Sequence, residues 1–373
     1  MSANTVPPLI IAQLNHLISQ SPFPIKVDQI WAGNKNVGLA DRITLVIPFC
    51  LDYIKWDVIY NALYPLSAPD IIFGPESENF RPLQISGELK NYLANWNSKD
   101  PTKLLSLVLE LRQLYMTYQR KRVEDVDDDR LKFEISTIMS REGIEMYMTS
   151  SNEKPEEVKF AVPLLGLDIN GMIPGCSWRH QQKIYLQVIF PVGRKYISAT
   201  SVPRLKLVSS PELKSLFSVE DFRLPSWLDG MCMAEYLPTL EELLQLQISD
   251  AISSIEARRK FIMALAPVFG RPLEAESVFC RKATCLGNSG VFVFLVHFSL
   301  PLQFPKQQPT LVLQSSQHFN SLGVPIKSAV ITEFPWSPRW EPTGMVERIY
   351  DYLVEECLNF KKYCIDITNQ QQR

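Results

Sequence analysis

The stretch "YPLSAPDIIFG", from Tyr64 to Gly74, decides how the chain is divided. In it an aromatic–proline pair is separated by three residues from a second proline, and a β-branched run follows. A similar string, "FPKQQPTLVLQ", runs from Phe304 to Gln314. Proline fixes its own φ and holds the preceding residue extended, so each string predicts a rigid bend that links two strands. The residues that carry this fold motif are Tyr64, Pro65, Pro69, Phe304, Pro305 and Pro309.

The motif recurs together with a downstream tryptophan. A weaker middle copy places Pro203 before "RLKLV", and a β-rich run precedes the proline in all three copies. Beyond each copy comes a tryptophan (Trp96, Trp227 or Trp340) and then a Pro-Thr pair, which predicts the start of a helix because proline suits the first helical turn. We expect Asp100 to cap the first of these helices. The copies are about 105 to 135 residues apart, which is the length of one domain.

Helical periodicity supports the same division. After Pro101 one apolar stripe advances by four and three residues, after Thr343 a second stripe does so, and between them one register persists from Leu240 to about Phe269. The sequence therefore predicts an α+β chain with three domains, at residues 1–120, 121–254 and 255–373. The two stripes consist of Leu104, Val108, Leu111, Tyr115 and Tyr118, and of Val346, Tyr350, Leu353, Cys357, Phe360 and Cys364.

Composition excludes several classes of protein. The 373 residues are 46% hydrophobic and 21% charged with a formal net charge of −2, which indicates an ordinary globular protein without a nucleic-acid partner. The apolar runs are too short to cross a bilayer, and we find no signal peptide, so we expect no membrane association. Seven scattered cysteines favour a reducing compartment, and we expect the protein inside the cell. The run from Arg120 to Arg130 reverses sign within a few residues, which is typical of a solvated helix end or linker.

Three long strings carry a resemblance to a known family. "ITLVIPFCLDYIKWDVIYNALYPLSAPDIIFG", "FLVHFSLPLQFPKQQPTLVLQSSQHF" and "FPWSPRW" resemble the brain and reproductive organ-expressed protein (BRE) family, at both ends of the chain and only diffusely between about Val123 and Pro238. The resemblance implies tandem ubiquitin-conjugating-enzyme-variant (UEV) or RWD-like domains. Each would be a small antiparallel sheet covered by helices, and long helices would join the domains.

The resemblance also implies a function. Members of this family are non-catalytic scaffold subunits of deubiquitinase assemblies, BRISC in the cytoplasm and a related nuclear DNA-damage complex, so we expect both locations. The expected partners are a JAMM-type zinc protease and an Abraxas-type pseudoprotease toward the N-terminal side, and a von Willebrand A-like subunit on the C-terminal unit. Ubiquitin binding is a further expectation. No cofactor is implied.

The residues themselves argue against catalysis. A ubiquitin-conjugating enzyme needs a thiol nucleophile shortly after a His-Pro-Asn turn. No cysteine occurs between Cys50 and Cys176, and Cys50 comes before the proline turn, on or beside a strand. In "HFN", beginning at His318, phenylalanine replaces the proline, and we expect His318 in a loop or turn. The next cysteine, Cys357, lies on a helical stripe and is predicted to be a core residue.

Metal sites are not indicated either. The four histidines (His16, His180, His297 and His318) are isolated from one another, whereas a JAMM protease needs two histidines one residue apart. The close pair Cys280 and Cys285 would point to opposite faces of a strand, and we interpret both as packing residues. We therefore predict no catalytic, cofactor-binding or metal-binding residues.

Recognition remains as the function. The loop "TEFPWSPRWEP" crowds aromatic residues among prolines, which limit the entropy lost on binding. Phe334, Trp336 and Arg339 are the candidates for partner binding, with the aromatic pair equally suited to core or interface, whereas Trp340 is predicted to be core. We hypothesise that this region receives an extended partner segment. The alternative is an active or accessory ubiquitin-conjugating component.

Overall fold

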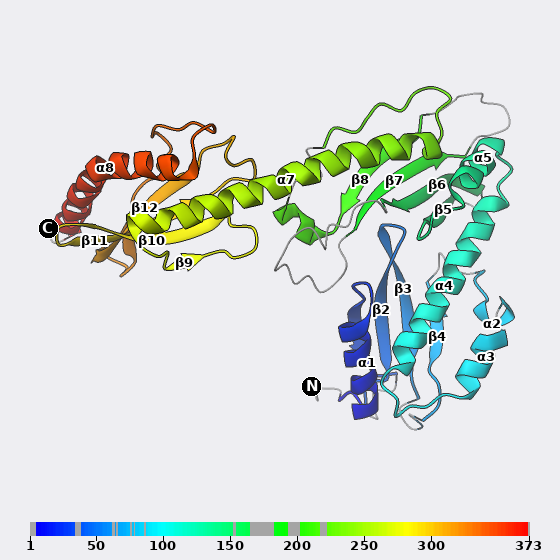
Figure 1. Ribbon diagram of the computed structural model, residues 1–373. Helices are drawn as coiled ribbons and strands as arrows, with labels where there is room; N and C mark the ends of the chain where they lie inside the picture. The colour runs from blue at the N-terminus through cyan, green and yellow to red at the C-terminus, as the bar shows by residue number, and fades with distance from the viewer. Residues whose placement is uncertain are drawn as a thin grey trace. The chain divides into compact units, whose positions relative to one another are not determined.

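The structure is a computed structural model that describes residues 5–33, 39–61, 64, 66–74, 77, 79–85, 87–151, 154–164, 183–192, 202–216 and 222–371. It is an α+β fold, and its described residues form three antiparallel sheets (Figure 1). The chain divides into two compact units. Unit 1 comprises Met1–Gly166, Arg179–Ser210 and Arg223–Leu240, and unit 2 comprises Leu167–Trp178, Pro211–Phe222 and Glu241–Arg373.

The first sheet of unit 1 has the strand order β1-β2-β3-β4, and helices cover one of its faces. In β2 and β3 the residues on this inner face, such as Ile43, Leu45, Trp56 and Val58, are at most 1% exposed. The opposite face carries cross-strand polar pairs such as Thr44 with Asp57. The elements are α1 (Pro8–Gln20), β1 (Lys26–Trp31), β2 (Arg42–Phe49), β3 (Asp52–Ile59), β4 (Asp70–Phe73), α2 (Pro82–Ile85), α3 (Gly87–Ala94) and α4 (Lys103–Glu124).

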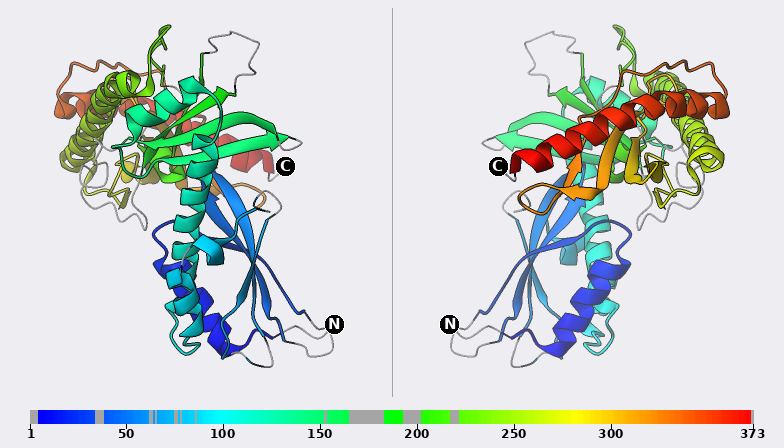
Figure 2. Two further views of the ribbon diagram at one scale, coloured as in Figure 1. Left: turned by 90° about the vertical axis from the view of Figure 1, so that its right-hand side faces the viewer. Right: turned by 90° about the vertical axis from the view of Figure 1, so that its left-hand side faces the viewer.

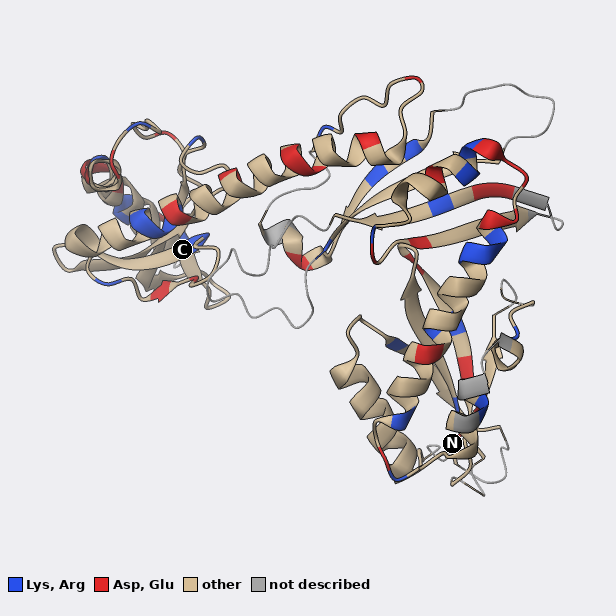
Figure 3. Cartoon of the chain, turned by 45° about the vertical axis from the view of Figure 1, so that its right-hand side comes forward, with Lys and Arg blue, Asp and Glu red and all other residues tan. Residues whose placement is uncertain are grey.

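The second sheet of unit 1 has the order β5-β6-β7-β8. Helix α5 begins after Asp128, whose carboxylate accepts hydrogen bonds from the backbone N–H groups of Arg130 and Leu131. The run from Arg120 to Arg130 therefore lies at a helix end, as predicted, and Figure 3 shows both charge signs close together there. The elements are α5 (Asp129–Ile138), β5 (Glu145–Ser151), β6 (Lys154–Pro163), β7 (Ile184–Pro191) and β8 (Arg204–Ser209).

Unit 2 contains the third sheet, of order β13-β12-β11-β10-β9, and helix α8 lies across it (Figure 2). Its core joins the inner faces of β10, β11 and β12 to the predicted stripe of α8, in which Val346, Leu353 and Phe360 are buried. The prediction is wrong for Tyr350, which is 44% exposed and packs its ring edge-on against Phe269 at 5.5 Å. The elements are η2 (Pro211–Ser215), β9 (Glu274–Ala275), β10 (Lys282–Ser289), β11 (Phe292–Ser299), β12 (Thr310–Phe319), β13 (Pro325–Lys327) and α8 (Pro342–Gln371).

The proline-led strands are confirmed. Strands β4, β8 and β12 begin directly after Pro69, Pro203 and Pro309, and each pairs antiparallel with the strand that precedes it in the chain. Each β-rich run before the prolines therefore forms one strand of a hairpin-like pair. The division into domains at residues 1–120, 121–254 and 255–373 stays a prediction.

Two predicted helix starts are wrong. Helix α7 (Met233–Phe269) begins five residues before Pro238, so this proline lies inside the helix rather than opening it. Helix α4 begins at Lys103, and its N-cap is Thr102 rather than Asp100. The Asp100 carboxylate instead accepts bonds from the backbone N–H and hydroxyl of Thr102 in the preceding turn. The third start is confirmed, because α8 begins at Pro342.

Candidate partner-binding site

The candidate loop before α8 is anchored by its aromatic side chains. Phe334 is 7% exposed, and its ring centroid lies 6.4 Å from that of Trp336. The half-buried Trp336 donates its indole N–H to the carbonyl oxygen of Pro305 at 3.1 Å. The rings of Phe261 and Phe304 lie 6.3 and 5.6 Å from Trp336. Two of the three predicted contact residues therefore hold the loop on the core of unit 2.

The fold motif explains how the loop reaches this position. Phe304 is 1% exposed, the bond between Phe304 and Pro305 is cis, and Pro309 is buried at the start of β12. Downstream, Ile331 exchanges two backbone hydrogen bonds with Leu311 of β12. The loop is thus tied to β12 at Ile331 and to Pro305 through Trp336, so that its remaining residues are presented on a fixed base.

Arg339 is the exposed member of the predicted trio. It lines a shallow hollow of about 500 Å³ at the start of α8. Trp340 forms another wall, half-buried against the core, and the Arg348 guanidinium lies 4.3 Å from the centroid of its ring. The full lining is Arg339, Trp340, Glu341, Gly344, Glu347, Arg348 and Asp351. The hollow presents both charge signs around an aromatic edge, which suits a polar peptide segment.

The N-terminal copy of the motif presents a different surface. Tyr64 is 69% exposed and Leu66 is 64% exposed, whereas Pro69 is buried. Trp96 is half-buried against the first core, 6.2 Å from the ring of Tyr92. Pro65, also predicted as a motif residue, lies outside the described residues. An exposed tyrosine and leucine on a proline bend are a second candidate contact surface.

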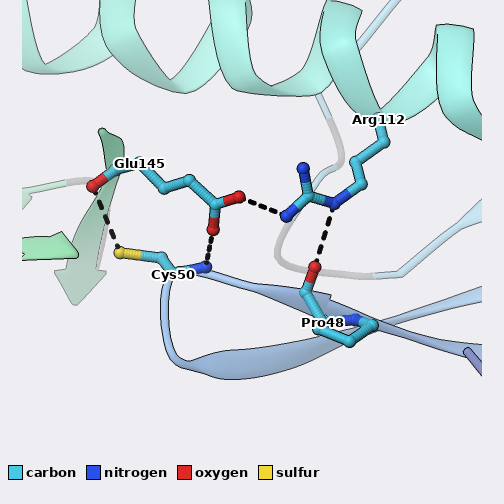
Figure 4. A network of polar contacts seen from close by, with 4 residues as sticks. All are labelled: Pro48, Cys50, Arg112 and Glu145. Atoms are coloured by element: carbon cyan, nitrogen blue, oxygen red, sulfur yellow. Dashed lines mark hydrogen bonds and ion pairs between the residues drawn. The ribbon is translucent and has the colours of Figure 1, made fainter. Parts of the chain in front are cut away.

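A polar junction in unit 1 was not predicted (Figure 4). The Glu145 carboxylate at the start of β5 pairs with the Arg112 guanidinium of α4 and accepts the backbone N–H of Cys50 at 2.5 Å. Arg112 also donates to the carbonyl oxygen of Pro48 at 3.0 Å and stacks over Phe23 at 4.5 Å. Arg112 and Glu145 are 33 residues apart and Cys50 is 95 residues from Glu145, so no local pattern indicates the contact.

The environment of Cys50 is not that of a nucleophile. The thiol lies at the end of the β2–β3 hairpin, where Cys50 and Leu51 have positive φ, and it contacts the carbonyl oxygen of Lys159 at 3.4 Å. Burial raises the pKa of the Cys50 thiol, and the Glu145 carboxylate adds to this rise. A thiol that keeps its proton is a poor nucleophile, because the thiolate is the reactive form.

Three further cysteines are buried in the core of unit 2, and His318 is bonded within its own strand. Cys357 is buried on α8, as predicted, and its thiol contacts the carbonyl oxygen of Val354 at 3.1 Å. The prediction for Cys280 and Cys285 is wrong in its geometry. Cys280 precedes β10 with a φ of 54°, so that both thiols lie in the same core. His318 lies in β12 rather than in a loop or turn, and its Nδ1 is 3.0 Å from the Ser315 hydroxyl.

The described residues contain neither a metal-binding cluster nor a membrane-spanning helix. Among them no group of three or more histidine, cysteine, aspartate or glutamate side chains is arranged to hold a metal ion. No helix in the same residues combines the length and apolarity needed to cross a membrane. His180 and Cys176 lie outside the described residues.

Comparison with known proteins decides the family. The model of the brain and reproductive organ-expressed protein (BRE) family matches residues 9–319. The chain belongs to the BRE family. A relative from Danio rerio, named "BRISC and BRCA1-A complex member 2", is 34% identical over 84% of this chain and 81% of its own length. A relative of the same name from Branchiostoma floridae is 28% identical over 87% of this chain and 84% of its own length.

Proposed function

We propose that this BRE-family chain is a non-catalytic scaffold and recognition subunit of deubiquitinase complexes of the BRISC and BRCA1-A kind. The observation that carries the proposal is the match to relatives named as members of those complexes, which extends over 84% of this chain and 81% of the Danio rerio protein. A match that covers more than four fifths of both chains supports the proposal that they share the same set of domains. Surfaces that bind the other subunits would then be shared as well.

The thiol environments support a non-catalytic role. The described cysteines Cys50, Cys232, Cys280, Cys285, Cys357 and Cys364 are all buried. Burial raises the pKa of Cys285 and of Cys364 to about 11, so both thiols keep their protons at neutral pH. A conjugating enzyme must expose a reactive thiolate to form its ubiquitin thioester. The alternative, a ubiquitin-conjugating component, therefore has no support from the described cysteines.

The domains of the subunit are proposed to be tandem UEV or RWD-like modules, at residues 1–120, 121–254 and 255–373. The supporting observation is that β1–β4, β5–β8 and β9–β13 form one small antiparallel sheet within each of these ranges. Helices α4 and α7, of 22 and 37 residues, extend across the two proposed boundaries.

The proposed partners follow the family. The C-terminal hollow at Arg339 and Trp340 is assigned to the von Willebrand A-like subunit, and the exposed bend at Tyr64 and Leu66 to the Abraxas-type pseudoprotease with its JAMM-type zinc protease. Direct ubiquitin binding by the UEV-like modules, and residence in both cytoplasm and nucleus, are part of the same proposal. Exposed Tyr64 and Leu66 at one site, and half-buried Trp340 among charged residues at the other, support these assignments, because interfaces need aromatic or apolar anchors.

Isolation of the tagged chain from native extract, followed by mass spectrometry, tests the proposal. We expect a JAMM-type protease and a pseudoprotease to co-purify in stoichiometric amounts. A second experiment incubates the chain with activating enzyme, ATP and ubiquitin and resolves the products on a non-reducing gel. A thiol-sensitive ubiquitin adduct on this chain would overturn the proposal in favour of a conjugating enzyme.

Arg339 offers the sharpest test of the C-terminal site. Replacing Trp336 would also remove its bond to Pro305 and its ring contacts, so a loss of binding would be ambiguous. Arg339→Glu changes only an exposed side chain, and we expect it to weaken binding of the von Willebrand A-like subunit by roughly tenfold. Lys282→Glu makes the same charge change at an exposed position of β10 and should leave the affinity unchanged. Equal affinities for both variants would exclude Arg339 from the interface.

A further inference from the structure

Helix α8 has an apolar stripe that its own sheet does not cover. One side of the helix is buried in the core of unit 2. Beside it lie Tyr350, Val354, Leu358 and Ile365, which are 44%, 53%, 51% and 41% exposed. At about 100° per residue these four side chains fall within an arc of roughly 80°. Such a stripe along some 16 residues is a surface on which another helix can pack.

The charges nearest the stripe are separated by sign, whereas Arg348 and Asp366 lie farther round the helix. Glu347, Asp351 and Glu355 follow one another at four-residue intervals in the first half of the helix, whereas Lys361 and Lys362 lie in the second half. Among the described residues, none of the five forms an ion pair within 4 Å. The stripe therefore has an acidic end and a basic end, and neither end has an ionic partner among the residues that the structure describes.

The spacing along the stripe is the same when counted from either end. The positions Glu347, Tyr350, Val354, Leu358, Lys362 and Ile365 are separated by three, four, four, four and three residues. If two such helices pack antiparallel about a two-fold axis at residue 356, Val354 faces Leu358 of the other copy. The same register sets Asp351 opposite Lys361, and symmetry repeats both pairs.

We propose that this face of α8 binds a second copy of the chain in an antiparallel, two-fold symmetric helix pair. A different partner helix would need apolar residues but would place no requirement on the order of charges in this helix. Antiparallel self-pairing does, because each acidic half must meet a basic half. The pair of Asp351 with Lys361 meets that requirement, and the symmetric spacing lets Val354 and Leu358 pack at the centre of the helix pair.

The size of the surface indicates a weak dimer. The stripe from residue 347 to 365 spans about 27 Å of helix. One helix pair of this length buries much less surface than the roughly 1,600 Å² of a stable interface. We therefore expect monomers and dimers to exchange, with dissociation constants in the range of about 10 to 100 μM. Glu347 and Asp351 also line the hollow at Arg339, so self-association would occupy part of that proposed partner site.

Sedimentation velocity of the full chain from about 2 to 200 μM tests the proposal. The weight-average sedimentation coefficient should rise with concentration for the natural sequence. Asp351→Lys and Lys361→Asp should each weaken the dimer by about tenfold, because each brings like charges together twice. An equimolar mixture of the two variants should recover the association. In the mixed dimer the introduced lysine of one variant faces the introduced aspartate of the other, and the unchanged Lys361 faces the unchanged Asp351.

Asp366→Lys is the matched control, since it makes the same charge change at an exposed position of α8 outside the stripe, and it should leave the association unchanged. A chain that stays monomeric at about 200 μM would overturn the proposal. The proposal would also be overturned if both stripe variants left the dimer intact, or if the equimolar mixture of the two variants failed to restore association. Circular dichroism spectra of the three variants would show that each retains its helices.

Discussion

The junction of Arg112, Glu145 and Cys50 should hold the end of the β2–β3 hairpin against β5. Glu145→Ala removes the acceptor of both the Arg112 guanidinium and the Cys50 N–H. Breaking a fully buried ion pair costs about 3 to 5 kcal/mol, but both side chains here retain 16% exposure, so that water can reach them. We therefore expect a loss of about 2 kcal/mol in the free energy of local opening.

Hydrogen exchange with mass spectrometry measures this loss directly, since it reports the opening of a single hairpin. A loss of about 2 kcal/mol should accelerate exchange of the β2–β3 backbone amides by roughly 30-fold. Glu145→Gln keeps one acceptor oxygen and should give an intermediate rate. These amides are bonded between the strands themselves, so they report the hairpin rather than only the lost bond at Cys50.

Asp52→Ala is the control in the same hairpin. Asp52 is 78% exposed and lies 3.9 Å from Lys159, so its loss should cost no more than about 0.5 kcal/mol. If Glu145→Ala accelerates exchange no more than Asp52→Ala does, the junction does not hold the hairpin. The reasoning from burial and pairing would then be refuted.

Three further outcomes are expected. A thiol reagent at pH 8 should modify Cys285 and Cys364 at least about 100-fold more slowly in the native protein than in the unfolded protein, because the buried thiols keep their protons. Equal rates in the two states would contradict the burial of these thiols. Burial raises the pKa of both thiols from 9.0 to about 11, so their contribution to stability is complete below pH 9 and is lost as the pH rises to 11. The free energy of unfolding, measured by urea titration, should fall between pH 9 and pH 11. In Cys364→Ala the fall should be less steep, because one of the two thiols is absent. Asp128→Ala removes the acceptor for two N–H groups at the start of α5 and should lower the free energy of unfolding by about 1 kcal/mol, whereas Asp127→Ala, one residue earlier, should change it far less.

Sequence patterns predicted the features that depend on near neighbours. The stripe that includes Val108 and Tyr115 is buried on α4, and the strands after Pro69, Pro203 and Pro309 pair as the repeated bend requires. Both rest on local rules, the helical period and the restriction that proline places on φ. The repeat also located the loop at Arg339, because the downstream tryptophan recurs.

The errors arose where distant contacts outweigh local preference. Helix α7 begins before Pro238 because its first turns are buried, with Met233 and Tyr236 at most 1% exposed, and this packing outweighs the local signal of the proline. Cys280 reaches the core through a positive φ that no sequence pattern indicates. The pairing of Arg112 with Glu145 joins α4 to β5, and only the folded chain brings those two residues together.

The buried end of the β2–β3 hairpin has a practical consequence for engineering. Hairpin ends usually accept inserted tags and probes, because their backbone faces solvent. At Cys50 the backbone N–H is bonded and the residue is 1% exposed, so an insertion there would displace β5 as well as lengthen the turn. The turn at Gly290 and Val291 is the better choice for a fluorescent label or affinity peptide, since Val291 is 84% exposed.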